Sequence, residues 1–193
     1  MSATSARINL KSISALLLAL SAVAATATMY HQYKHDWPYA GRPGVRAPLQ
    51  AANDRKPAPD FELQDSSGKV SRIKDYHGKV LLLDFWATWC TGSKKEIPWF
   101  AQFQKIYDAK GFAVVGISLD GGGWKVLKPF VSGTQIPYRI LLGDDTTAQR
   151  YGIANMPETF LIDRYGRVAA VYRAGLVDKD DVEVNVRTML SEH

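Results

Sequence analysis

From residue 59 onward, short apolar runs alternate with longer segments in which apolar residues recur every three or four positions. The short runs predict strands, and the unbroken ones at residues 80–86 and 112–119 are typical of strands covered on both faces. The longer segments predict helices, because this spacing places the apolar residues on one side of a helix. The other predicted elements are a strand at 139–142 and helices at 93–109, 124–131, 146–151 and 178–191.

Two pairs of short strands flank polar, turn-forming residues. Strands 61–63 and 70–73 enclose one turn, and strands 159–163 and 168–173 enclose another. Each pair predicts a β-hairpin. The order strand–helix–strand, followed by a hairpin and a helix, predicts an α/β fold with a central mixed β-sheet flanked by helices and an N-terminal β-hairpin.

The first 30 residues follow a different pattern. Residues 13–30 are uncharged and mostly apolar, and they come after Arg7 and Lys11. A basic flank before an apolar run is typical of an export signal, and ~18 residues is near the lower limit for spanning a bilayer. We therefore expect residues 1–30 to be an N-terminal signal or membrane anchor, and favour a retained anchor. The chain would be exported, at the cell-envelope or periplasmic face, or secreted after signal cleavage.

Residues 31–56 are rich in proline and glycine, which predicts a semi-rigid linker. The domain itself would then comprise residues 57–193. The net charge of +5 resides outside this domain: residues 1–56 carry seven basic and two acidic side chains, whereas residues 57–193 carry 17 of each. A neutral domain has no net attraction to phosphates, which argues against nucleic-acid binding.

The chain has one cysteine, Cys90, between the strand 80–86 and the helix 93–109. A thiol at the start of a helix faces unpaired backbone N–H groups and the positive end of the helix dipole. Lys94 and Lys95 add positive charge, and all three effects favour the nucleophilic thiolate. The alternative is a buried, inert cysteine. With one cysteine and no cluster of ligands at metal spacing, we expect no disulfide within the chain, no metal and no cofactor.

Two segments carry a family resemblance. Residues 85–98 read Phe-Trp-Ala-Thr-Trp-Cys-Thr-Gly-Ser-Lys-Lys-Glu-Ile-Pro, and residues 156–163 read Met-Pro-Glu-Thr-Phe-Leu-Ile-Asp. They resemble the TlpA/ResA-like thiol–disulfide oxidoreductases, which are exported, often membrane-tethered proteins of thioredoxin-like fold. The second segment is also similar to the cytochrome-c-maturation thioredoxins. The resemblance covers residues 57–193.

The resemblance implies roles for four residues around the thiol. Cys90 matches the first cysteine of the family, but Ser93 stands where the family has the second, so an internal disulfide cannot form. What remains is monothiol exchange, in which Cys90 forms a mixed disulfide that an external thiol releases. Asp84 matches a buried proton acceptor and Glu96 a family acid, although Glu96 can also be interpreted as a solvated carboxylate near a helix start.

Three further residues are implied in substrate binding. Pro157 matches the cis-proline of the fold, which lies against the cysteine, and the backbone of Met156 would pair with an extended substrate chain. Trp89, beside Cys90, would lie on the docking surface.

The implied partners are protein thiols and disulfides, including apocytochrome c, and a thiol-reducing donor in the membrane. We expect a monomer attached to the membrane through its N-terminal segment. Two alternatives remain open. A redox-inactive module could bind extended chains without exchange. A peroxiredoxin-like peroxidase shares the fold, but its motif has Thr three residues before the cysteine, where this chain has Ala87.

Overall fold

The computed structural model describes residue 24 and residues 47–173 and 178–192. The expected signal or anchor therefore lies outside the described residues, apart from Ala24. Within the described ranges, no helix combines the length and the apolar character that crossing a bilayer requires.

The centre of the domain is one mixed sheet of eight strands, in the order β1-β8-β7-β4-β5-β6-β2-β3. The central strand β4 pairs in parallel with β5 and antiparallel with β7, so the sheet is mixed as expected. The strands are β1 (Lys56–Pro57), β2 (Glu62–Gln64), β3 (Val70–Arg72), β4 (Val80–Trp86), β5 (Phe112–Ser118), β6 (Arg139–Leu142), β7 (Glu158–Ile162) and β8 (Arg167–Tyr172).

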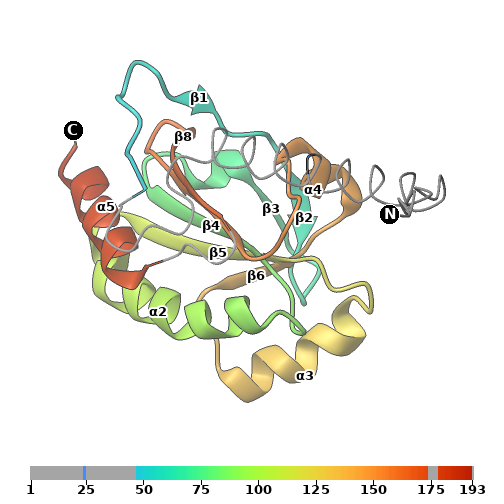
Figure 1. Ribbon diagram of the computed structural model, residues 1–193. Coiled ribbons are helices and arrows are strands. Elements are labelled where there is room, and N and C mark those ends of the chain that lie inside the picture. The colour runs from blue at the N-terminus through green and yellow to red at the C-terminus, as the bar shows by residue number, and fades with distance from the viewer. Residues whose placement is uncertain (1–23, 25–46, 174–177, 193) are drawn as a thin grey trace, which may run out of the picture. The chain divides into compact units, whose positions relative to one another are not determined.

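Helices cover both faces of this sheet (Figure 1). Helices α2, α3 and α5 pack on one face, and α4 packs on the other with the 3₁₀ helix η1. These elements are η1 (Ile73–Tyr76), α2 (Thr91–Tyr107), η2 (Asp108–Lys110), α3 (Trp124–Thr134), α4 (Asp145–Arg150) and α5 (Lys179–Ser191).

Strand β4 divides its side chains between two apolar cores. Leu82 and Trp86 face the core under α2, whereas Leu81, Leu83 and Phe85 face the opposite core. All seven residues of β4 are buried, because both faces of the sheet are covered. The alternation also assigns Asp84, the one polar residue of β4, to the same side as Leu82 and Trp86, which is the side of α2.

The predicted thioredoxin-like α/β fold is confirmed. Strands β4 and β6 coincide with their expected ranges, and β2 and β3 form the expected antiparallel hairpin. Helix α2 begins two residues earlier than predicted, because Cys90 rather than a later residue is its N-cap.

Residues 47–57 contact the domain, although composition assigned residues 47–56 to the linker. The backbone N–H of Gln50 donates to the carbonyl of Ala169 over 2.8 Å, and β1 pairs antiparallel with β8. The guanidinium of Arg55 is buried. Proline-rich composition argues against a helix, but an extended segment can still pair with the edge of a sheet.

A candidate thiol site at the start of helix α2

Cys90 is the N-cap residue of α2, directly after the turn that follows β4. Its N–H donates to the carbonyl of Ala87 over 3.0 Å, and its own carbonyl accepts from the N–H of Lys94 over 3.2 Å. The first turn of α2 contains no acidic residue. The thiol is 8% exposed and therefore lies just beneath the surface, near the unpaired N–H groups at the start of a helix.

The Pro157 loop lies against this first turn. A β-carbon built on Gly92 would be only 2.9 Å from Cδ of Pro157 and 3.9 Å from Sγ of Cys90, so glycine permits this close approach. The Met156–Pro157 peptide is cis. Met156 is partly buried, whereas the side chain of Trp89 is 65% exposed.

Asp84 lies fully buried in β4, on the α2 side of the sheet. Its Oδ1 accepts one hydrogen bond, from the hydroxyl of Thr159 over 3.2 Å, and its Oδ2 has no partner. Burial raises the pKa of Asp84 to about 7, and the Thr159 hydrogen bond opposes that rise. Asp84 can therefore exchange a proton close to neutral pH.

Glu96 is buried too, at 4% exposure, so its interpretation as a solvated carboxylate is wrong. Its position is six residues into α2, on the face that packs on the sheet. Burial, followed by the negative charges of Asp84 and Cys90, raises the pKa of Glu96 to about 9. Glu96 thus stays protonated at neutral pH and lies near both Asp84 and Cys90. We call Asp84 and Glu96 the carboxyl pair.

Ser93 lies one turn after Cys90 on the same buried face of α2. Its side chain is fully buried, and its hydroxyl has no hydrogen-bond partner. Leaving a buried hydroxyl unpaired costs roughly 1–3 kcal/mol, whereas a thiol in the same place behaves as a small apolar group. The surroundings of Ser93 suit sulfur better than oxygen.

Sequence reasoning missed a third acid, Glu158, which follows Pro157 at the start of β7. It is buried and pairs with the guanidinium of Arg173 over 2.8 Å. Burial raises the pKa of Glu158 to about 7, and the positive charge of Arg173 opposes that rise. Asp84 was singled out by the family resemblance, which gave no role to Glu158. The signal that could have found Glu158 is an acid directly before the apolar run of residues 159–163.

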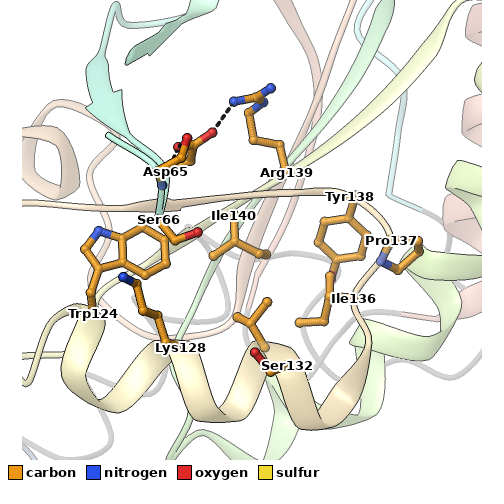
Figure 2. A pocket seen from close by; sticks show the side chains of 12 residues that line it. Asp65, Ser66, Trp124, Lys128, Ser132, Ile136, Pro137, Tyr138, Arg139 and Ile140 are labelled. Atoms are coloured by element: carbon orange, nitrogen blue, oxygen red, sulfur yellow. Dashed lines mark hydrogen bonds and ion pairs between the residues drawn. The ribbon is translucent and has the colours of Figure 1, made fainter. Parts of the chain in front are cut away.

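A cavity of about 410 Å³ lies between α3, β6 and the β2–β3 turn (Figure 2). Arg139 is ion-paired with Asp65 at its rim. Tyr138 lines the cavity, and its pKa is raised by burial and by the negative charges of Asp84 and Glu96. Tyr138 is therefore the wall residue of the cavity that feels the charge of the carboxyl pair, and the cavity lining does not include Cys90.

No group of three or more potential metal ligands occurs in the part of the chain that the structure describes. The site brings together a thiol at the start of a helix, the Pro157 loop beside it and the buried acids Asp84 and Glu96.

This combination of fold and site defines a thioredoxin-like protein with a thiol at the start of its first helix after the central strand. The family model for the AhpC/TSA family matches residues 55–171. The chain belongs to the AhpC/TSA family.

Its relatives include thiol–disulfide oxidoreductases. The chain is 31% identical to ResA from Geobacillus thermodenitrificans over 133 residues, which cover 68% of this chain and 75% of that protein. It is 30% identical to ResA from Bacillus subtilis over 128 residues, covering 66% and 71%. A solved thiol:disulfide interchange protein of the thioredoxin family from Chlorobium tepidum TLS is 28% identical, with a TM-score of 0.65, and covers 73% of this chain and 100% of that one.

Proposed function

We propose that this protein carries out thiol–disulfide exchange on protein disulfides by a monothiol route, with Cys90 as its nucleophile. The observation that carries the proposal is the position of the chain's only cysteine, at the N-cap of α2 and beside the Pro157 loop. The relatives named above are thiol–disulfide oxidoreductases, which supports the same chemistry.

The reaction balances in two exchange steps. The Cys90 thiolate attacks one sulfur of a substrate disulfide, forming a Cys90–substrate disulfide and releasing the other sulfur as a thiolate. An external thiol then attacks the mixed disulfide, regenerates the Cys90 thiolate and leaves with the substrate sulfur as a new disulfide. Because the chain has no second cysteine, the second step depends on that external thiol.

The carboxyl pair and the Pro157 loop have separate parts in this scheme. Negative charge on Cys90 favours the protonated form of Glu96, so Glu96 holds a proton next to the sulfur that gains and loses charge. Asp84, with a pKa raised to about 7, is the residue of the pair that exchanges protons at neutral pH. The backbone of Met156 pairs with the extended substrate chain by strand addition, and the exposed side chain of Trp89 lies on the docking surface.

The setting and partners follow from the sequence. We place the domain outside the cytoplasm, tethered by residues 1–30, where protein disulfides persist. The partner classes are exported proteins with cysteines, of which apocytochrome c is one, and an external thiol or a membrane donor that supplies one.

The test is a trapping experiment on the full chain. Incubation with a peptide carrying a mixed disulfide should give a covalent adduct at Cys90 by mass spectrometry, and Cys90→Ala should give none. Release of the adduct should be first order in added glutathione. Steady turnover without added thiol would exclude the monothiol route. If the peptide instead binds wild type and Cys90→Ala equally, without an adduct, the protein is a binding module.

A further inference from the structure

Asp120, just after β5, is a buried carboxylate with no part in the exchange scheme. Its side chain accepts three hydrogen bonds: from the Thr88 N–H over 2.9 Å, from the Thr88 hydroxyl over 2.7 Å and from the Ser118 hydroxyl over 2.7 Å. Asp120 is 6% exposed and Ser118 is fully buried. Both oxygens of one carboxylate thus hold Thr88, 32 residues earlier in the chain.

Thr88 belongs to the turn that carries the thiol. Residues 87–90 connect β4 with α2, and the Cys90 N–H donates back to Ala87 within that turn. One more bond ties the two segments: the Leu119 N–H donates to the Trp86 carbonyl over 2.9 Å. The turn is therefore attached to the segment after β5 at two successive points, Trp86 and Thr88.

The side chain of Trp89, next to Thr88, does not hold the turn in place. Trp89 lies between Thr88 and Cys90, and because it is 65% exposed, it cannot hold the turn by packing. On the helix side, the close contact between Gly92 and Pro157 leaves little room for the first turn of α2 to shift. The position of Cys90 relative to the Pro157 loop thus depends on both ends of the turn: on the Gly92–Pro157 contact after Cys90 and on the Asp120–Thr88 bonds before it.

We propose that Asp120 is a positioning residue for thiol–disulfide exchange, acting through Thr88 to hold Sγ of Cys90 in register with a substrate chain on the Pro157 loop. The inference rests on the proposed function. A carboxylate suits this task because its two oxygens accept from all three partners at once and its charge strengthens each bond, whereas a neutral amide has one accepting oxygen and would have to donate to one of the hydroxyls. Reactions between held groups are sensitive to displacements of about 1 Å.

The experiment compares two disulfide probes on the full chain. One is dithiodipyridine, which is too small to need the Pro157 loop, and the other is a cysteine-containing peptide as its mixed disulfide. Second-order rate constants for Cys90 are measured with wild type, Thr88→Val, Thr88→Ser and Asp120→Asn, at a temperature at which circular dichroism shows each variant folded. The matched control is Tyr172→Phe, which removes a buried hydroxyl that bonds Asn185 over 2.8 Å.

We expect the peptide rate constant to fall roughly 10-fold in Thr88→Val and Asp120→Asn, with the dithiodipyridine rate constant changed by less than about 2-fold. Thr88→Ser keeps the hydroxyl, so its rate constant with the peptide should be close to that of wild type. Tyr172→Phe should lower the thermal stability, while the rate constants for the peptide and for dithiodipyridine stay as in wild type.

Peptide rate constants of folded Thr88→Val within about 2-fold of wild type would overturn the inference, and so would an equal fall with both probes. If Asp120→Asn does not fold, the inference is judged from the peptide rate constants of Thr88→Val and Thr88→Ser. If the wild-type protein reacts with neither probe, the proposed function itself is refuted. This outcome is distinct from a failure of the inference, which is judged only from the variants.

Discussion

Two groups of acidic side chains in this domain, each built around buried carboxyl groups, differ in what surrounds them. The carboxyl pair behind Cys90 has one hydrogen-bond donor, Thr159, and two oxygens without partners. Asp163, at the end of β7, is equally buried but accepts from two backbone N–H groups and pairs with two guanidiniums. We call the second set the ion-pair clamp; it consists of Arg55, Asp163, Arg167 and Glu192.

The two sets also shift pKa values in opposite directions. Burial raises the pKa of both members of the carboxyl pair, whereas hydrogen bonding to Arg55 lowers the pKa of Glu192 in the clamp. In the clamp, the ion pairs of buried Asp163 and partly exposed Glu192 hold the segment before β1 against the β7–β8 turn and the C-terminus. Within the described residues, the carboxyl pair has no such counter-charges, so its acids keep a proton available near neutral pH. This pair lies near Cys90, the only thiol of the chain.

Among substitutions that test this difference between the thiol site and the clamp, we expect the largest effect from Ser93→Cys. The new thiol lies one helical turn from Cys90, within bridging geometry, so a disulfide should form under mild oxidants. Catalytic insulin reduction should then appear in the variant, whereas we expect none in the wild type. The unpaired hydroxyl is also removed, so the free energy of unfolding should rise by about 1 kcal/mol.

Ser93→Ala is the control for that variant. It removes the same unpaired hydroxyl without adding sulfur, so it should share the gain in stability and lack the activity. A folded Ser93→Cys protein that forms no internal disulfide would show that the surroundings of residue 93 do not suit sulfur.

The next largest effect is expected in the clamp. Arg55→Ala removes the guanidinium that donates to Glu192 over 2.7 and 2.8 Å and contacts Asp163. Breaking a buried pair from one side costs about 3 kcal/mol, measurable by urea unfolding, while the Cys90 exchange rate should stay unchanged. Arg72→Ala, which breaks the exposed pair with Glu62, should cost less than about 1 kcal/mol. Equal losses in the two variants would contradict the role given to the clamp.

The sequence predicts an element of this structure well when the interactions that form the element lie within its own residues, and poorly when they involve residues far away in the chain. The ranges of β4 and β6 follow from their own apolar runs. Strand β1 was missed because two residues carry no periodicity, and their pairing with β8 depends on residues more than 100 positions away. Likewise, the Asp120–Thr88 bonds join two turns that look ordinary in sequence.

The site shows the same division. Cys90 and its helix start are visible in the sequence, because a lone cysteine after an apolar run is a local signal. The burial of Glu96 was missed by treating the start of the helix as solvated, although its spacing of four and seven residues from Phe100 and Phe103 places it on the apolar face of α2. No local signal reveals that Oε2 of its carboxyl group lacks a hydrogen-bond partner.

A further effect concerns the pH dependence of stability, and it is read as the change in stability per pH unit. Because the folded pKa of Glu96 is raised to about 9, the folded state keeps a proton that the unfolded state loses above about pH 4.5. Stability from this group is therefore present at low pH and declines as the pH rises toward 9, by up to about 1.4 kcal/mol per unit. Glu96→Gln should flatten this decline in urea titrations between pH 5 and 9.

Asp84→Asn should flatten the decline only up to about pH 7, since the pKa of Asp84 is raised to about that value. An unchanged slope in both variants would mean that the carboxyl pair ionises as it does in water.

The smallest effect comes from the clamp and has the opposite sign. The lowered pKa of Glu192 means that the folded state releases its proton more readily than the unfolded state, so this group stabilises the fold above its ordinary pKa and loses that contribution as the pH falls through the folded value. Because the side chain of Glu192 is 39% exposed, the contribution should be under about 1 kcal/mol. Urea unfolding between pH 3 and 6 should therefore show a shallower acid-side loss in Glu192→Gln than in wild type, while the decline toward pH 9 stays as in wild type. If Glu192→Gln altered the alkaline side instead, the clamp and the carboxyl pair would be one coupled network rather than two sets with separate tasks.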